Sequence, residues 1–382
     1  MTGWNKGKTK NDTVYIIVLI LISLLLSRAF MYFWFVYDQK SWDFNLFMQK
    51  MNIWDAGWYR AIGMDLYPDH ANDPVTGQAA WAFFPLYPVV VHYLYVVTKI
   101  DMNYLASFLS TLLLGMAEFM GYQYIKMTRN DSRQGLGYIY FMSFGVYSFY
   151  FSSFYTEALY LFLLTCAFYF MQKEEYLKMG MAGALLSLTR NTGIFFCFVI
   201  LVFWIKKYCK QPGGSIGGFM KETVCNYRLI AGTMLVPLGF FSYMVYLKYK
   251  VGDAFAFLHV QKAWWRQDLG TVKVVAGELL DQFPPGYHAI CFLISVFLLV
   301  SLILKHRRLE EATLPVITLL MASSSSLGST PRYMAGSFTV VIALTDEWKG
   351  CSGINKILIC ILLFVLELIC VNGWLNGSVA LI

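Results

Sequence analysis

The feature that most constrains this chain is a series of apolar stretches long enough to cross a lipid bilayer. A spanning helix needs about 20 apolar residues, because its backbone polar groups must pair within the helix. Hydrophobic residues make up 58% of the 382 residues and charged residues only 14%, whereas soluble domains average about 25% charged. This balance excludes a soluble globular enzyme and a disordered chain. The expected fold class is all-α, a polytopic membrane protein.

About eleven segments are expected to form spanning helices, some of them at half length. The run 83–99 is apolar as well, and it is expected to lie as a helix against the outer surface; the alternative is that it crosses the membrane. The whole chain, 1–382, is then a single integral-membrane domain. The expected spans are 14–36, 104–125, 135–154, 157–172, 179–190, 192–205, 228–247, 287–304, 312–328, 333–345 and 355–373.

Clusters of basic residues predict the orientation, because Lys and Arg are enriched in cytoplasmic loops. All clusters lie inside if 14–36 leads out and 104–125 returns. Two large loops, 37–103 and about 248–286, then face outward, and the first has seven Asp against four Lys or Arg, a net charge of −3. The basic clusters lie at 6–10, 126–133, 173–178, 206–210 and 305–308.

Several classes of function lack their sequence signature. Neither a P-loop nor a dinucleotide-binding glycine motif occurs, so no ATP or nucleotide-sugar held in such a fold is expected. The eight cysteines form no CxxC pair, and none lies between Asp38 and Asp101, so no disulfide framework is expected on the outer surface. The net charge of +7 is accounted for by the inside loops, and no nucleic-acid partner is inferred.

The first outer loop places Asp55 among aromatic residues just outside a span. A partly dehydrated setting raises the cost of the carboxylate charge and makes the group a better base. The alternative is a solvated Asp in an interfacial aromatic belt. The neighbouring candidates for substrate contact are Trp54, Trp58, Tyr59 and Arg60.

Three charged residues lie where spans begin or break at the outer side. Glu157 starts an apolar run, Arg190 lies between two half-length spans, and Arg332, followed by Tyr333, enters a span after a proline. Charged groups at such depth are functional candidates, and the planar fork of arginine suits a phosphate. The alternatives are a helix-start acid for Glu157 and a salt bridge from Arg190 to Glu157 or to an Asp of the first loop. Arg332 is also expected to have a partner.

The second outer loop adds further cations and aromatic side chains. The stretch 254–265 has helical spacing with aromatics on one face, which is typical of an amphipathic helix at a membrane surface. Direct ligand contact is the alternative for Lys262, Arg266 and Trp264. Together these features indicate a sugar linked to a lipid phosphate as the ligand. The cations would bind the phosphate, the spans would contact the lipid tail, and the aromatic faces would stack on sugar rings.

The order of motifs resembles the PIG-V-type mannosyltransferases, relatives of GPI mannosyltransferase 2 with the C-type glycosyltransferase (GT-C) architecture, and in particular their bacterial members. The resemblance covers most of the chain, with one departure at Met64–Leu66, where Gly-Tyr is common. The matching motifs are WDAGWYRAI (54–62), AFFPLYP (82–88), SFYTEALYL (153–161), AGALLSLTRNTGIF (182–195), GDAFAF (252–257), QKAW (261–264) and TPRYM (330–334).

The resemblance implies a multi-span enzyme that transfers mannose from a polyprenyl-phosphate donor outside the cytoplasm, with inversion at the anomeric carbon. It implies that Asp55 is the catalytic acid/base. We expect Arg190 and Arg332 to hold the donor phosphate, with Lys262 and Arg266 as further candidates.

Partners and location follow from the same reasoning. The expected partners are the donor, a lipid or glycan acceptor, membrane lipids and a small membrane subunit in some settings. The expected location is a bacterial cell membrane, or the endoplasmic reticulum membrane in a eukaryote, with an extracytoplasmic site. No cofactor is required, and the loop carboxylates could accept a divalent metal, but no spacing demands one. A transporter or flippase without chemistry, and a C-type transferase for another sugar, stay open as alternatives.

Overall fold

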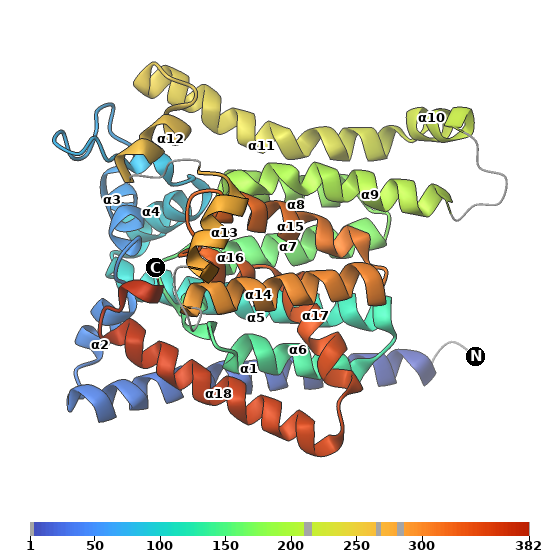
Figure 1. The fold of residues 1–382 in the computed structure, drawn as a ribbon, viewed down its shortest axis with the longest axis horizontal. Helices are drawn as coiled ribbons and strands as arrows, with labels where there is room; N and C mark the ends of the chain where they lie inside the picture. Colours follow the sequence, from blue (N-terminus) through green and yellow to red (C-terminus); the bar gives the residue numbers. More distant parts are fainter. Residues whose placement is uncertain (1–3, 210–215, 265–268, 281–285, 382) are drawn as a thin grey trace.

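The computed structural model describes residues 4–209, 216–264, 269–280 and 286–381, and within these ranges it contains helices and no strand (Figure 1). Six segments are long and apolar enough to cross a membrane, which confirms the predicted class of an all-helical polytopic membrane protein. They are Asp12–Gln39, Met102–Arg129, Asn191–Cys209, Tyr227–Val251, Tyr287–Lys305 and Gly353–Leu375.

The main bundle combines the helices of these six segments with others. The six segments contain α1 (Trp4–Gln39), α5 (Met102–Arg129), α9 (Phe196–Cys209) with the turn before it, α11 (Tyr227–Val251), α14 (Tyr287–Val300) with the turn after it, and α18 (Gly353–Leu375). The other helices of the bundle are α6 (Ser132–Phe144), α7 (Glu157–Gln172), α8 (Tyr176–Thr189), α15 (Leu309–Ser323), α16 (Thr330–Ala335) and α17 (Phe338–Gly350).

Small elements lie around the bundle. Figure 1 shows α2, α3, α4 and α12 gathered at its left end, whereas α10 lies at its right end. The bounds are α2 (Phe44–Met51), α3 (Ala56–Asp65), α4 (Leu86–Thr98), α10 (Ile216–Cys225), α12 (Ala256–His259) and α13 (Thr271–Leu280). Short 3-10 or π turns are η1 (Ala80–Ala82), η2 (Ser148–Ser152), η3 (Asn191–Phe195), η4 (Val260–Trp264), η5 (Ser301–Lys305) and η6 (Val379–Leu381).

The basic helix ends meet at one end of the bundle, opposite α3 and α4 (Figure 1). Arg129 at the end of α5 pairs with Glu311 at the start of α15, and Lys206 at the end of α9 pairs with Glu310 at 2.7 Å. As predicted, α1 leads away from this end and α5 returns to it. Residues Leu86–Thr98 form α4 beside α3, and the position of this helix on the membrane surface stays a prediction. Which side of the membrane this end faces stays a prediction.

Glycines bring α8 and α11 into backbone contact. A Cβ on Gly180 would overlap the backbone of Gly232, and a Cβ on Gly239 would overlap the carbonyl of Ala184. Close approach through small residues is a typical way for helices to associate in lipid. Because α11 leads directly into α12 and η4, this contact sets the position along α8 at which the second loop leaves the bundle.

Several predicted helices differ from expectation. The span expected at 333–345 is divided between α16, which ends at Ala335, and α17, which begins at Phe338, and the span expected at 312–328 ends at Ser323. The span expected at 135–154 is interrupted, because α6 ends at Phe144 and a 3-10 turn, η2, follows Gly145. A Cβ at Gly145 would overlap the carbonyl of Phe141, so the chain can turn there only without a side chain. The amphipathic helix expected at 254–265 is limited to α12 and the 3-10 turn η4 within the described residues.

Candidate active site

Asp55 lies at the N-terminal end of α3, in a turn held by the chain that precedes α7. The amide of Asp55 donates to the hydroxyl of Tyr155 (3.2 Å), and this hydroxyl donates to the carbonyl of Ile53 (3.0 Å). Trp54 has a φ of 57°, a left-handed value that is uncommon for such a residue and turns the chain into the helix. The Asp55 side chain is 26% exposed, so it is partly accessible to solvent.

The two predicted phosphate-binding arginines share one buried carboxylate. Arg190 Nη1 donates to Glu157 Oε1 at 2.9 Å, and Arg332 Nε donates to the same oxygen. Glu157 is completely buried, and the arginine side chains are 10% and 8% exposed. Of the alternatives left open by the sequence, the salt bridge between Arg190 and Glu157 is therefore present.

Arg332 also reaches the candidate base. Its Nη1 donates to Asp55 Oδ2 at 2.5 Å, although 277 residues separate the two in sequence. The partner expected for Arg332 is therefore a pair of carboxylates, Glu157 on one side and Asp55 on the other. Four charged groups from α3, α7, α16 and the junction after α8 thus form one chain of ion pairs with balanced charge.

The local backbone explains why these side chains converge. Helix α8 ends at Thr189, and Arg190 takes an extended conformation (φ −153°, ψ 147°) before the 3-10 turn η3. This break at Arg190 was predicted from the sequence. Glu157 is the first residue of α7, where a negative charge interacts favourably with the helix dipole. Pro331 lies in the first turn of α16 and starts that helix beside Arg332.

Aromatic rings cover the arginine pair. Arg332 lies over the ring of Tyr155 and Arg190 over the ring of Tyr333, each at 4.5 Å from guanidinium to ring centroid. Planar guanidinium groups stack well on such rings. Burial raises the pKa of the Tyr59 hydroxyl, which therefore stays protonated and lies 3.4 Å from the hydroxyl of Thr156.

A second group of aromatic side chains joins the two outer loops. Trp58 stacks on Phe83 with 5.7 Å between ring centroids, and Trp264 of η4 packs edge-on against Trp58 at 5.4 Å. Gln78 donates to the carbonyl of Ala263 (3.4 Å) at the same contact. Trp264 of the second loop therefore lies against Trp58 of the first loop, and its contact with a ligand stays a prediction.

The remaining predicted residues have other surroundings. Arg60 donates to the side chain of Asn103 (2.5 Å) and to the carbonyl of Asn52 (3.2 Å), so it ties α3 to the start of α5. Trp54 is 39% exposed, and Lys262 is exposed on η4. Arg266 lies outside the described residues.

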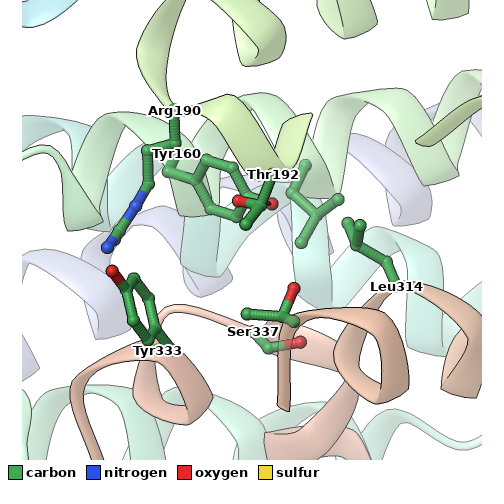
Figure 2. A pocket seen from close by; sticks show the side chains of 8 residues that line it. Tyr160, Arg190, Thr192, Leu314, Tyr333 and Ser337 are labelled. Carbon is green, nitrogen blue, oxygen red and sulfur yellow. Dashed lines mark hydrogen bonds between the residues drawn. The ribbon is translucent and has the colours of Figure 1, made fainter. Parts of the chain in front are cut away.

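A small cavity of ≈ 10 Å³ lies behind Arg190, large enough for about one water molecule. Figure 2 shows Arg190, Tyr160 and Thr192 on one side of it and Tyr333 and Ser337 on the other. Among the described residues no group of three or more His, Cys, Asp or Glu could hold a metal ion, and a requirement for metal stays a matter for experiment.

Sequence reasoning did not single out Tyr155 as a site residue. This side chain supports both the Asp55 turn and the Arg332 guanidinium, as described above. Tyr155 lies in the motif 153–161, two residues before Glu157, and this proximity is the signal that could have identified it.

Comparison with known proteins identifies the architecture. No protein family matches the sequence, and no curated protein does. The structure is similar to ArnT from Cupriavidus metallidurans, solved with bound undecaprenyl phosphate, with a TM-score of 0.54 and 14% identity over 96% of this chain and 76% of that one. The fold is of the GT-C type. It is also similar to the archaeal oligosaccharyltransferase AglB from Archaeoglobus fulgidus, solved with an inhibitory peptide and a dolichol-phosphate (TM-score 0.51, 11% identity, 99% of this chain and 56% of that one).

At such identities the likeness establishes the fold alone, and the chain spans little more than half of the oligosaccharyltransferase. The predicted GT-C architecture is therefore confirmed, whereas the PIG-V resemblance stays a sequence-based prediction.

Proposed function

We propose that this protein is a membrane glycosyltransferase that moves a sugar, mannose, from a polyprenyl-phosphate donor to a hydroxyl of a lipid or glycan acceptor, with inversion. The observation that carries the proposal is a partly exposed carboxylate, Asp55, beside two buried arginines on a GT-C fold. The likeness to two proteins solved with polyprenyl-type phosphates supports the class of donor. The motif order supports mannose and the PIG-V type.

In the proposed reaction Asp55 accepts the proton of the acceptor hydroxyl, whose oxygen forms a bond to the anomeric carbon. The bond from that carbon to the phosphate oxygen breaks, and its electron pair leaves with the lipid phosphate. Because the negative charge grows on this phosphate, the arginines stabilise the transition state, which is commonly the largest catalytic contribution. A positioned base contributes about 10²–10⁴ in rate.

Each residue of the site has a proposed role. Arg190 and Arg332 bind the phosphate, Glu157 holds the two guanidinium groups side by side, and Trp58 with Trp264 offers aromatic faces to the sugar. Lys262, which is exposed on η4, is a further candidate cation for the phosphate. The proposed site opens outside the cytoplasm, in a bacterial cell membrane as the motif order suggests.

The test is transfer of label from radiolabelled polyprenyl-phosphate mannose to a membrane lipid extract, by wild type and by Asp55→Asn in detergent. We expect turnover to fall by about 10² or more in the variant, because the base is lost. The control Asp65→Asn, an exposed residue of the same helix, should transfer label at the wild-type rate. A wild-type rate in Asp55→Asn would refute the role of the base. Transfer of label from a donor that carries a different sugar would leave the assignment as a glycosyltransferase intact, but that sugar would replace mannose in the proposal.

A lipid transporter is the second candidate, and the break between α8 and α9 at Arg190 favours it, because broken helices line many transport sites. This function predicts that labelled lipid moves across the membrane of vesicles that contain the protein, and that no glycosidic product forms.

A further inference from the structure

Arg332 lies between two carboxylates that differ in their access to solvent. Its Nε contacts Glu157, which is completely buried, whereas its Nη1 contacts Asp55, which is 26% exposed. Arg190 contacts the same oxygen of Glu157. The inner contact is therefore shared and enclosed, and the outer contact involves a carboxylate that is partly exposed to solvent.

The outer contact conflicts with the proposed work of both partners. Asp55 Oδ2 already accepts a hydrogen bond from Arg332 Nη1, so this oxygen has less room for a second hydrogen bond from an acceptor hydroxyl. An arginine that already donates to Asp55 has fewer N–H groups for a phosphate. Asp55 and the donor phosphate thus compete for the same guanidinium group.

The geometry allows Arg332 to bind Asp55 first and the phosphate afterwards. A guanidinium carries five N–H donors, and the contact to Glu157 uses only the Nε side of Arg332. This contact can hold the side chain in place while Nη1 changes partner. The Asp55 side chain, at the more exposed end of the ion-pair chain, can then move away from Nη1 as the incoming anion takes its place.

We propose that the Asp55–Arg332 ion pair is a resting contact that the donor phosphate opens by taking Arg332 Nη1, so that Asp55 is released toward the acceptor. This inference rests on the proposed function and concerns the regulation of the same site. The base becomes available only when an anionic donor is bound. When Asp55 then accepts the proton, the new charge on the leaving phosphate already faces Arg332.

The test is a double-mutant cycle on lipid-phosphate binding, without any sugar. The binding constant of a polyprenyl phosphate in detergent is measured for wild type, Asp55→Asn, Arg332→Gln and the double variant. If Asp55 competes for Arg332, Asp55→Asn binds the lipid phosphate about fivefold more tightly than wild type, as expected for one partly exposed ion pair. The same Asn substitution has no effect on affinity in the Arg332→Gln background.

Two controls separate exchange from a general electrostatic effect. Asp65→Asn removes an equal charge from the same helix at an exposed position and should leave the affinity unchanged. Polyprenol, the neutral alcohol, should bind all variants alike. Melting temperatures in detergent verify that each variant is folded.

The outcomes distinguish this inference from the proposed function. Equal or weaker binding by Asp55→Asn overturns the exchange and leaves the donor site intact. Tighter binding that persists in the Arg332→Gln background also overturns it, because simple charge repulsion then explains the gain. If wild type does not bind the lipid phosphate, or if Arg332→Gln does not weaken binding, the proposed donor site is wrong and the exchange falls with it.

Discussion

The substitution Glu157→Gln tests the ion-pair chain most directly. Glu157 Oε1 accepts from Arg190 at 2.9 Å and from Arg332, and the side chain is completely buried. Glutamine keeps the size and an acceptor oxygen but removes the charge, so two enclosed guanidinium groups are left with only Asp55. Removal of one partner from a buried ion pair costs about 3–5 kcal/mol, and we expect the free energy of unfolding to fall by about that amount.

The measurement is unfolding in mixed micelles by titration with a denaturing detergent, followed by tryptophan fluorescence. The matched control is Glu175→Gln, which removes a partly exposed acid paired with Lys178 at 2.6 Å and should change stability by less than about 1 kcal/mol. The double variant Glu157→Gln/Arg190→Met restores the charge balance, since Asp55 and Arg332 remain as a pair. It should regain much of the stability but none of the transfer activity. A Glu157→Gln protein as stable as the Glu175→Gln control would refute the argument.

Three further predictions concern the bundle and the reaction. Gly239→Leu forces a side chain into the backbone of α8, so the melting temperature should fall and the transfer rate with it, whereas Gly350→Leu, where a Cβ meets open space, should change neither. Within the described residues Arg28 faces two buried carboxylates, Glu118 and Glu367, each with one unpaired oxygen; either single change to Gln should leave the melting temperature unchanged or higher, and the double change should lower it, because Arg28 then lacks a counter-charge. Transfer should continue in EDTA, and loss of activity that Mg²⁺ or Mn²⁺ restores would contradict the prediction that no metal is required.

The sequence was informative where the signal is local. The helix break at Arg190 and the helix start near Pro331 follow from residues within one turn, and both are present. Six of the eleven expected spans coincide with the six segments that are long and apolar enough to cross a membrane, because length and hydropathy are properties of a single segment. In the described part of the chain the other five correspond to shorter or divided helices. The break after Phe144 was missed, since a lone glycine in an apolar run does not reveal whether its neighbours leave room for a side chain.

The pairing of charges could not be predicted in the same way. Asp55 and Arg332 are 277 positions apart, and nothing in either motif specifies that the two side chains meet. The salt bridge from Arg190 to Glu157 was one of several alternatives for the same reason. Contacts across a bundle depend on how helices pack, and for α8 and α11 that packing depends on glycines whose role is visible only when both helices are in place.

The ion-pair chain gives each buried arginine a counter-charge. Two neighbouring arginines would repel each other inside a membrane protein, and their burial would be unfavourable without such partners. Glu157 neutralises the inner side permanently because it is enclosed, and Asp55 neutralises the outer side from a position that solvent can reach. In the exchange that we propose, the carboxylate that neutralises the outer side of Arg332 is also the one that leaves it when an anionic donor binds. The stability of the ion-pair chain and the access to the proposed base would then be two consequences of one contact.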